Sequence, residues 1–333
     1  MRIYVTGSRG YLGSALTEYL RRQGWTVVEN QCDIRDYRGL LDELITATPQ
    51  LIIHLAACST IEKCEQHPRQ ALTTNAIGTR NIVSIMKTIG CRNIIYASSE
   101  AVYGSSNYPV TEYSKVNPSS VYGITKLLGE LCIRNSRVNY VIMRMSNVGG
   151  FHSHFSRHSE GTRLWGRLYN ATRNGHPFTV YGIDYHTRDG TEERDYLHIQ
   201  DAVHAYYLTA LRLTSPSSAS LPRPLRSPSS ASLPRPLRSP VANRSPSSAS
   251  LPRPHPRIEV ILNLASGYTF TVGEIVRMWQ DHLYHQGSPV LDIVVGSRRP
   301  GDPDSIAMTT HQLFQYLSWR PRLAISDIIG SYY

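Results

Sequence analysis

The chain has 333 residues, of which 41% are hydrophobic and 18% charged, and its formal net charge at pH 7 is +10. These values predict a soluble globular protein of one large or two modest domains, and no apolar run reaches the roughly 20 residues of a membrane span. The chain opens directly into an apolar segment without a basic leader, and its five cysteines form no CxxC motif, so we expect reduced thiols and a cytoplasmic location.

Short apolar runs rich in β-branched residues alternate with helical periodicity through the first half of the chain. The expected strands are 2–7, 26–30, 51–57, 93–99 and 139–145. The expected helices between them are 11–23, 37–47, 68–89 and 121–135. Strands without polar alternation are buried on both faces, so this order predicts an α/β fold of the Rossmann type with a doubly wound parallel sheet.

The alternation of expected strands and helices becomes irregular after Gly150. We assign residues 1–150 to a nucleotide-binding domain and expect segments at about 178–205 to complete its sheet. We assign residues 151–333 to a smaller C-terminal substrate-binding lobe. Its expected elements are helices near 161–174, 201–213 and 271–285, with short strands at 178–182 and 259–266.

A repeat interrupts the second half. The unit SPSSASLPRPLR occupies 215–226 and 227–238, and a shortened copy occupies 245–254. Such a Pro- and Ser-rich unit can neither continue a helix nor bury apolar surface, so we predict a disordered insertion at 215–256. Seven arginines and no acid lie in 215–257, so most of the net charge arises there. Binding of a polyanion such as nucleic acid, or of a docking partner, is left open for these repeats alone.

A glycine-rich turn, TGSRGYLG at 6–13, follows the first expected strand and opens the first expected helix. Gly7, Gly10 and Gly13 allow the backbone to approach a pyrophosphate, and the helix N-terminus supplies free N–H groups. This context favours a dinucleotide site over a purely structural turn.

An acidic residue, Glu29, ends the second expected strand. There a carboxylate could accept hydrogen bonds from the adenosine ribose and repel a 2′-phosphate, which favours NAD over NADP. An exposed acid at a strand end is the alternative reading. Asp33 and Ile34 follow closely and could flank the adenine.

Tyr122 and Lys126 lie four residues apart in SSVYGITK, one turn apart on a helix. An ordinary polar helix face is one interpretation. The other is a phenol whose pKa is lowered by the neighbouring cation, so that it can act as a base. His152, His154 and His158 raise the possibility of metal binding, but no acid pair or cysteine completes a site, so we expect none.

Motifs along nearly the whole chain resemble the extended short-chain dehydrogenase/reductases. Within these, the chain is similar to the NAD-dependent nucleotide-sugar epimerase/dehydratase family, above all to its UDP-glucose 4-epimerase group. The motifs are TGSRGYLG (6–13), CDIRD (32–36), IIHLAA (52–57), NAIGT (75–79), ASSEAVYG (97–104), PSSVYGITK (118–126), RMSNVGG (144–150), YGIDYHTRDGTEERDYLHIQD (181–201), LNLASG (262–267) and RRPGD (298–302).

The resemblance implies roles for individual residues. Tyr122 is the implied catalytic base, Lys126 its pKa-lowering partner and ligand of the nicotinamide ribose, and Ser99 a hydrogen-bond partner of the reacting sugar oxygen. The implied NAD-binding residues are Gly7, Gly10, Tyr11, Leu12, Gly13, Glu29, Asp33, Ile34, Ala56, Ala57, Asn75, Tyr122 and Lys126. The implied residues for the nucleotide sugar are Ser99, Asn147, Tyr181, Arg194, Arg299 and Asp302.

The implied reaction is epimerisation of a UDP-hexose at C4, through a transient 4-keto sugar, without net consumption of NAD. The resemblance also implies a homodimer formed through the helix that carries Tyr122. The identity of the nucleotide and of the sugar, including tolerance of an N-acetyl group, is left open.

Some positions depart from the family pattern. Ser59 stands where many members carry a lysine, and the region after the second strand is short, as in the 4-keto-sugar reductases. Glu100 followed by Ala101 lacks the acidic pair of the dehydratases, which argues against dehydration. A nucleotide-sugar reductase is therefore one alternative, and a non-catalytic NAD-binding scaffold is a second.

Overall fold

The computed structural model describes residues 1–106, 108–152, 163–215, 257–299 and 301–333. Its centre is a six-stranded sheet whose strands pair in parallel in the order β2-β1-β3-β4-β5-β9. The strands are β1 (Arg2–Thr6), β2 (Thr26–Glu29), β3 (Leu51–His54), β4 (Asn93–Ser99), β5 (Asn139–Met145) and β9 (Glu259–Leu264). The α/β class predicted from the sequence is confirmed.

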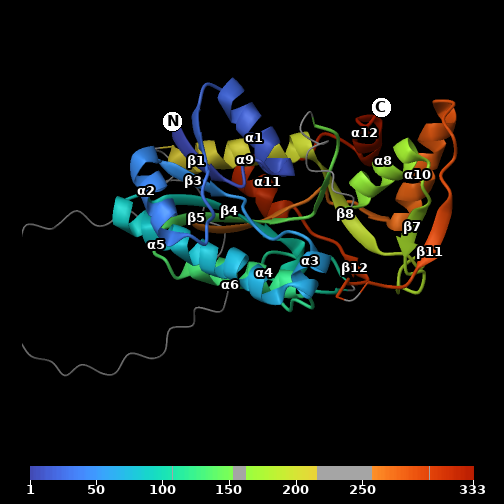
Figure 1. The fold of residues 1–333 in the computed structure, drawn as a ribbon, viewed down its shortest axis with the longest axis horizontal. Helices are drawn as coiled ribbons and strands as arrows, with labels where there is room; N and C mark the ends of the chain where they lie inside the picture. The colour runs from blue at the N-terminus through green and yellow to red at the C-terminus, as the bar shows by residue number, and fades with distance from the viewer. Residues whose placement is uncertain (107, 153–162, 216–256, 300) are drawn as a thin grey trace, which may run out of the picture.

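Helices cover both faces of this sheet, as Figure 1 shows. One face carries α1 (Tyr11–Arg22), α9 (Ile199–Thr214) and α11 (His311–Leu317). The other carries α2 (Tyr37–Ala47), α5 (Thr79–Ile89) and α6 (Val121–Arg134). Because both faces are covered, the strand residues Ile3, Tyr4 and Val5 are fully buried whichever way they point.

The sixth strand of the main sheet comes from a later part of the chain than we expected. Residues 178–205 do not complete the sheet; β9 does, pairing with β5 from Tyr140 opposite Glu259 to Met145 opposite Leu264. The strands within 178–205 pair inside the smaller body instead, β7 with β11 and β8 with β6, β10 and β12. The predicted domain boundary near residue 150 stays a prediction, since β9 returns to the first sheet from beyond it.

The remaining elements build a smaller body at one end of the main sheet (Figure 1). Its strands are β6 (Asn147–Gly149), β7 (Phe178–Tyr181), β8 (Glu193–His198), β10 (Thr269–Thr271), β11 (Ile293–Gly296) and β12 (Ser305–Ile306). Its helices are α8 (Leu164–Asn174), α10 (Val272–His285) and α12 (Ile325–Gly330). Trp165, Trp279 and Tyr332 lie in its core, where Trp165 stacks on Tyr332 at 6.4 Å between ring centroids.

The long helix expected at 68–89 is divided into three parts. After α3 (Ile61–Gln66), α4 (Pro68–Leu72) leads into a π-helical turn, Thr73–Gly78, and then into α5. Such turns widen a helix by one residue and are frequent at functional sites. Here the turn carries Asn75.

None of the described helices combines the length and the apolar character needed to cross a bilayer. The repeat insertion predicted at 215–256 lies, except for Ser215, outside the described residues.

Candidate active site

A cleft of about 1170 Å³ opens at the carboxyl ends of the parallel strands. It is larger than the roughly 300–1,000 Å³ of a typical small-molecule site. Most of the residues proposed from the sequence line it, namely Gly7, Gly10, Tyr11, Leu12, Gly13, Asp33, Ile34, Ala56, Ala57, Ser99, Tyr122, Lys126, Asn147, Tyr181, Arg194, Arg299 and Asp302. In an open α/β sheet this edge is where ligands bind.

The glycine-rich turn between β1 and α1 tolerates no side chain at two positions. Gly7 has φ +69°, and a Cβ there would lie 2.7 Å from the Ala56 nitrogen. A Cβ on Gly13 would lie 2.0 Å from the Gly7 carbonyl oxygen. The turn is therefore packed against both the loop after β3 and its own helix, which directs the first amides of α1 into the cleft.

Gly13→Ala tests this turn. The added methyl group must push the Gly7 carbonyl aside, so we expect a loss of about 1–3 kcal/mol in the free energy of unfolding and a lower content of bound dinucleotide. Chemical denaturation and absorbance of the released cofactor measure the two effects. The matched control is Gly330→Ala, because nothing lies within 4 Å of a Cβ at Gly330. Wild-type dinucleotide content in Gly13→Ala would contradict the prediction.

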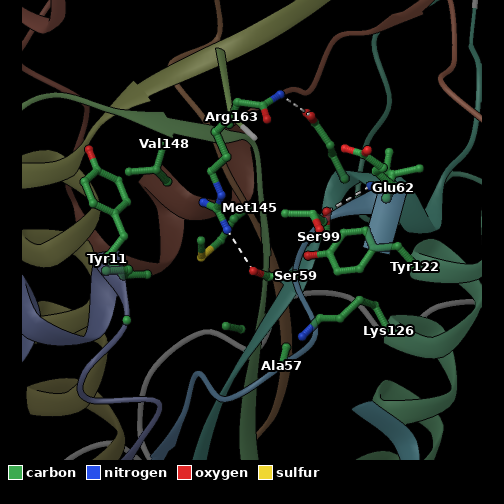
Figure 2. Close-up of a pocket in the computed structure, with 18 of the residues that line it drawn as sticks. Tyr11, Ala57, Ser59, Glu62, Ser99, Tyr122, Lys126, Met145, Val148 and Arg163 are labelled. Carbon is green, nitrogen blue, oxygen red and sulfur yellow. Dashed lines mark hydrogen bonds between the residues drawn. The ribbon is translucent and has the colours of Figure 1, made fainter. Parts of the chain in front are cut away.

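Ser99, Tyr122 and Lys126 meet on one wall of the cleft (Figure 2). Ser99 ends β4, whereas Tyr122 and Lys126 are one turn apart at the start of α6. That start is fixed by Ser120, whose hydroxyl accepts from the Gly123 N–H at 3.1 Å. The Glu65 carboxylate accepts from the Val121 N–H at 2.7 Å. The cleft-facing interpretation of the Tyr122 and Lys126 pair is thus favoured over an ordinary polar helix face.

The electrostatics of this set differ from our expectation. Burial raises the pKa of Tyr122 above its usual value, whereas hydrogen bonding to Ser99 and the charge of Arg163 lower it. Burial also lowers the pKa of Lys126 to about 7, against the charge of Glu130. The Lys126 ammonium nitrogen lies 4.3 Å from the centroid of the Tyr96 ring. Desolvation therefore dominates both groups in the ligand-free protein, and the expected lowering of the tyrosine pKa is not seen.

A buried ion pair holds α6 against the sheet. Arg144 on β5 and Glu130 on α6 lie 2.7 Å apart with side chains 3% and 0% exposed. Ser98 on β4 donates to the same carboxylate at 2.6 Å. Because three elements meet at one carboxylate, the helix that carries Tyr122 and Lys126 has a defined position relative to Ser99.

Two of the proposed cofactor residues do not line the cleft. The Asn75 amide is bonded to the Cys58 backbone, accepting from the N–H at 2.8 Å and donating to the carbonyl at 3.0 Å. Asn75 therefore fixes the backbone of the loop after β3 without lining the cleft itself. Glu29 pairs with Arg21 at 2.6 Å. Because Glu29 does not line the cleft, the interpretation as a strand-end acid fits the ligand-free structure better.

The far wall of the cleft carries the arginines proposed for the substrate. Arg194 and Arg299 share the carboxylate of Glu192, at 2.7 and 2.9 Å. Arg299 also pairs with Asp302 at 2.7 Å, and its guanidinium carbon lies 5.2 Å from the centroid of the Tyr181 ring. Sequence reasoning missed Glu192, although it lies inside the motif that contains Arg194.

Asn147 contacts an acid that the sequence analysis used only to argue against dehydration. Its side-chain amide donates to Glu100 at 3.0 Å. Glu100 lines the cleft but is 6% exposed, and its second carboxyl oxygen has no hydrogen-bond partner among the described residues. Burial raises the pKa of Glu100 well above its usual range.

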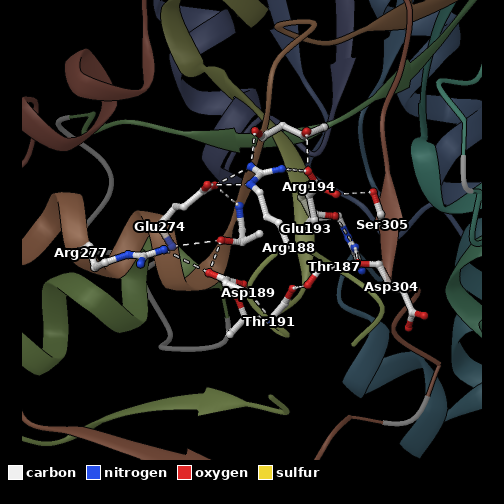
Figure 3. A network of polar contacts seen from close by, with 12 residues as sticks. Thr187, Arg188, Asp189, Thr191, Glu193, Arg194, Glu274, Arg277, Asp304 and Ser305 are labelled. Carbon is white, nitrogen blue, oxygen red and sulfur yellow. Dashed lines mark hydrogen bonds and ion pairs between the residues drawn. The ribbon is translucent and has the colours of Figure 1, made fainter. Parts of the chain in front are cut away.

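A polar network outside the cleft fixes the strand that presents Arg194 (Figure 3). Arg188 pairs with Glu274 on α10 at 2.5 Å and with Glu193 on β8. Ser305 on β12 donates to the same Glu193 at 2.8 Å. Since neighbouring residues of a strand point to opposite faces, anchoring Glu193 in this network turns Arg194 toward the cleft.

The histidine motif gives no metal site in the part of the chain that the structure describes. His152 contacts Glu18 at 3.1 Å, and His154 and His158 lie outside the described residues. Within the described ranges there is no group of three or more His, Cys, Asp or Glu with a metal-binding arrangement.

Arg163 also lines the cleft, although the sequence analysis did not propose it as a site residue. It precedes α8, and its guanidinium donates to the Ser59 hydroxyl at 2.9 Å. Ser59 stands where many family members carry a lysine, so the sequence indicated that a cation was missing there. The sequence could not indicate that Arg163 would supply a cation near Ser59, because these two residues are 104 positions apart.

A parallel sheet, a glycine-rich turn and a Ser, Tyr and Lys set in one cleft define a dinucleotide-binding protein of the short-chain dehydrogenase/reductase class. The sequence profile of the NAD dependent epimerase/dehydratase family matches residues 3–218. The chain belongs to this family.

Individual relatives carry more specific names. A Mycoplasma genitalium UDP-glucose 4-epimerase is 29% identical over 62% of this chain and 70% of its own length. A Lactobacillus helveticus UDP-glucose 4-epimerase is 24% identical over 99% of this chain and 96% of its own. The crystal structure of the Bifidobacterium longum UDP-glucose 4-epimerase, in complex with NAD+ and UDP, superposes with a TM-score of 0.80 at 20% identity, covering 99% of this chain and 96% of that one.

Proposed function

We propose that this protein is an NAD-dependent nucleotide-sugar 4-epimerase that interconverts the gluco and galacto forms of a UDP-hexose. The observation that carries the proposal is the position of Ser99, Tyr122 and Lys126 between the glycine-rich turn and the arginines of the far wall. The names of the relatives, UDP-glucose 4-epimerase, support the choice of reaction and substrate.

The cleft fits a dinucleotide at its glycine-rich end. Gly7 and Gly13 leave no room for side chains, and the first amides of α1 are available to a pyrophosphate. Asp33 and Ile34 line the cleft where an adenosine would lie, and Lys126 would hold the nicotinamide ribose. NAD bound here supplies the acceptor and later the donor of a hydride.

Residues of the chain would carry out the proton transfer and bind the nucleotide sugar. Tyr122 accepts the proton of the sugar 4-hydroxyl, and Ser99 holds the same oxygen by a hydrogen bond. A protonated Lys126 favours the tyrosinate by charge. Arg194 and Arg299 bind the diphosphate once it displaces Glu192, because guanidinium groups suit bidentate contacts to phosphate. Asp302 accepts from ribose hydroxyls.

The test is to incubate the purified protein with UDP-glucose and, separately, UDP-N-acetylglucosamine, with no added cofactor, and to resolve the products by NMR. We expect the galacto epimer to appear, with bound NAD recovered unchanged. The proposal fails if neither sugar is epimerised while a 4-keto nucleotide sugar is reduced with consumption of NAD(P)H. That outcome would establish the reductase alternative.

Assembly and location form the remaining part of the proposal. A homodimer through α6 is supported by Ile124 and Leu131, which are 46% and 41% exposed on that helix. Light scattering of the purified protein measures the assembly.

A cytoplasmic location is supported by the five cysteines, which are all free. Cys58 and Cys64 remain thiols although their sulfurs lie 3.5 Å apart.

A further inference from the structure

Arg163 joins two walls of the cleft that are distant in sequence. Its backbone lies just before α8 in the smaller body, and its side chain reaches Ser59 in the loop after β3, with 2.9 Å between Nη2 and Oγ. Figure 2 shows the guanidinium between Tyr11 on one side and Ser99 and Tyr122 on the other. The side chain thus lies across the cleft between the glycine-rich turn and the catalytic wall.

The charge of Arg163 is not neutralised by the contact that it makes. Arg194 and Arg299 both face the Glu192 carboxylate, whereas Arg163 faces a neutral hydroxyl and makes no ion pair with any described residue. A guanidinium needs acceptors for five N–H donors, so one hydroxyl leaves most of its bonding capacity to an incoming ligand. An anion that enters the cleft therefore gains a cation without having to displace a carboxylate.

The field of this cation extends to both ends of the reaction site. The positive charge of Arg163 lowers the pKa of Tyr122 and also opposes the effect of burial on Tyr11. Tyr11 begins α1 at the glycine-rich turn, and Tyr122 is the catalytic phenol. The charge of Arg163 therefore acts on both the glycine-rich end and the Tyr122 end of the cleft.

We propose that Arg163 is a diphosphate-binding arginine of the occupied cleft, held by Ser59 until a nucleotide enters. It supplies from α8 the positive charge that the loop after β3 lacks at Ser59. The inference rests on the proposed function, which brings two diphosphates into this cleft, one in NAD and one in the UDP-sugar. Both present the same chemistry to a guanidinium, and the experiment separates them.

The test compares Arg163→Gln with wild-type protein in two binding measurements. One is the rate at which bound NAD is lost on dilution, and the other is the affinity of the NAD-loaded protein for UDP by calorimetry. We expect one of the two to change by roughly 10- to 100-fold, the usual effect of removing a charge-assisted hydrogen bond. Faster loss of NAD assigns the arginine to the cofactor, and weaker UDP binding assigns it to the substrate.

The matched control is Arg173→Gln, which removes an exposed guanidinium from the same helix outside the cleft. It should leave both measurements at the wild-type values. The proposal is overturned if Arg163→Gln changes neither measurement. It is also overturned if turnover falls while both affinities stay constant, because the arginine would then act only on the Tyr122 pKa.

A relocated charge gives the strongest form of the test. Adding Ser59→Lys to the Arg163→Gln variant places an ammonium at the other end of the original contact. We expect this double variant to recover the affected affinity, whereas Ser59→Gln in the same background should not. Neither binding measurement requires turnover, so a protein that binds NAD and UDP without epimerising them would refute the proposed function and leave this inference standing.

Discussion

Replacing Tyr122 with phenylalanine is expected to lower kcat by about a thousandfold or more, with bound NAD retained. The change removes one hydroxyl and keeps the ring, which is half-buried in the wall of the cleft. Acid–base catalysis by a positioned side chain contributes roughly 10²- to 10⁴-fold, and Tyr122 is the cleft-lining phenol that is hydrogen-bonded to Ser99. NMR detection of the epimer measures the rate.

The control for Tyr122→Phe is Tyr108→Phe, at a side chain that is 80% exposed. It should keep wild-type activity. The pH dependence provides a second check, because the base acts as tyrosinate and burial raises the pKa of Tyr122. In wild-type protein, kcat/KM is therefore expected to rise with pH through the neutral and mildly alkaline range. Substantial epimerisation by Tyr122→Phe would remove the tyrosine from the mechanism.

Replacing Lys126 with methionine is expected to have opposite effects on activity and stability. Turnover should fall by about 10²-fold or more, since the variant loses both the charge beside Tyr122 and the contact to the cofactor ribose. The NAD-free protein should become more stable at neutral pH, because the lysine is buried and 2% exposed. Methionine fills the space without a charge that must be desolvated.

The sign of the pH dependence follows from the two pKa values of Lys126. The unfolded chain keeps a pKa near 10.5, whereas burial lowers it to about 7 in the folded protein. Between these values the unfolded chain binds more protons, so this group makes the free energy of unfolding rise from pH 7 toward 10.5. Below pH 7 its full penalty is present.

Urea unfolding of the NAD-free proteins at pH 6.5, 7.5 and 8.5 measures this dependence. The advantage of Lys126→Met over wild type should be largest at pH 6.5 and shrink as the pH rises. Lys87→Met, at an exposed position on α5, should leave the pH profile unchanged. A stability difference between Lys126→Met and wild type that does not vary with pH would show that the lysine is not desolvated as described.

Local patterns in the sequence were sufficient for the fold class and for the glycine-rich turn, and the family resemblance supplied the proposed substrate-side residues of the cleft. The helix expected at 37–47 has those bounds, and the one expected at 121–135 ends one residue earlier. The glycine-rich turn and the Tyr122 and Lys126 pair were found for the same reason. Turn chemistry and helical spacing are properties of a few consecutive residues, so they can be read without knowing what packs against them.

Only the tertiary structure decided the pairings between distant segments. The sequence could not choose between 178–205 and β9 for the sixth strand, because the choice depends on which segment meets the free edge of β5. It could not place Asn75 behind the cleft, join Arg194 to Arg299 through Glu192, or bring Arg163 to Ser59. It also could not show that burial raises the Tyr122 pKa, because desolvation depends on everything that surrounds a group and not on its neighbours along one helix.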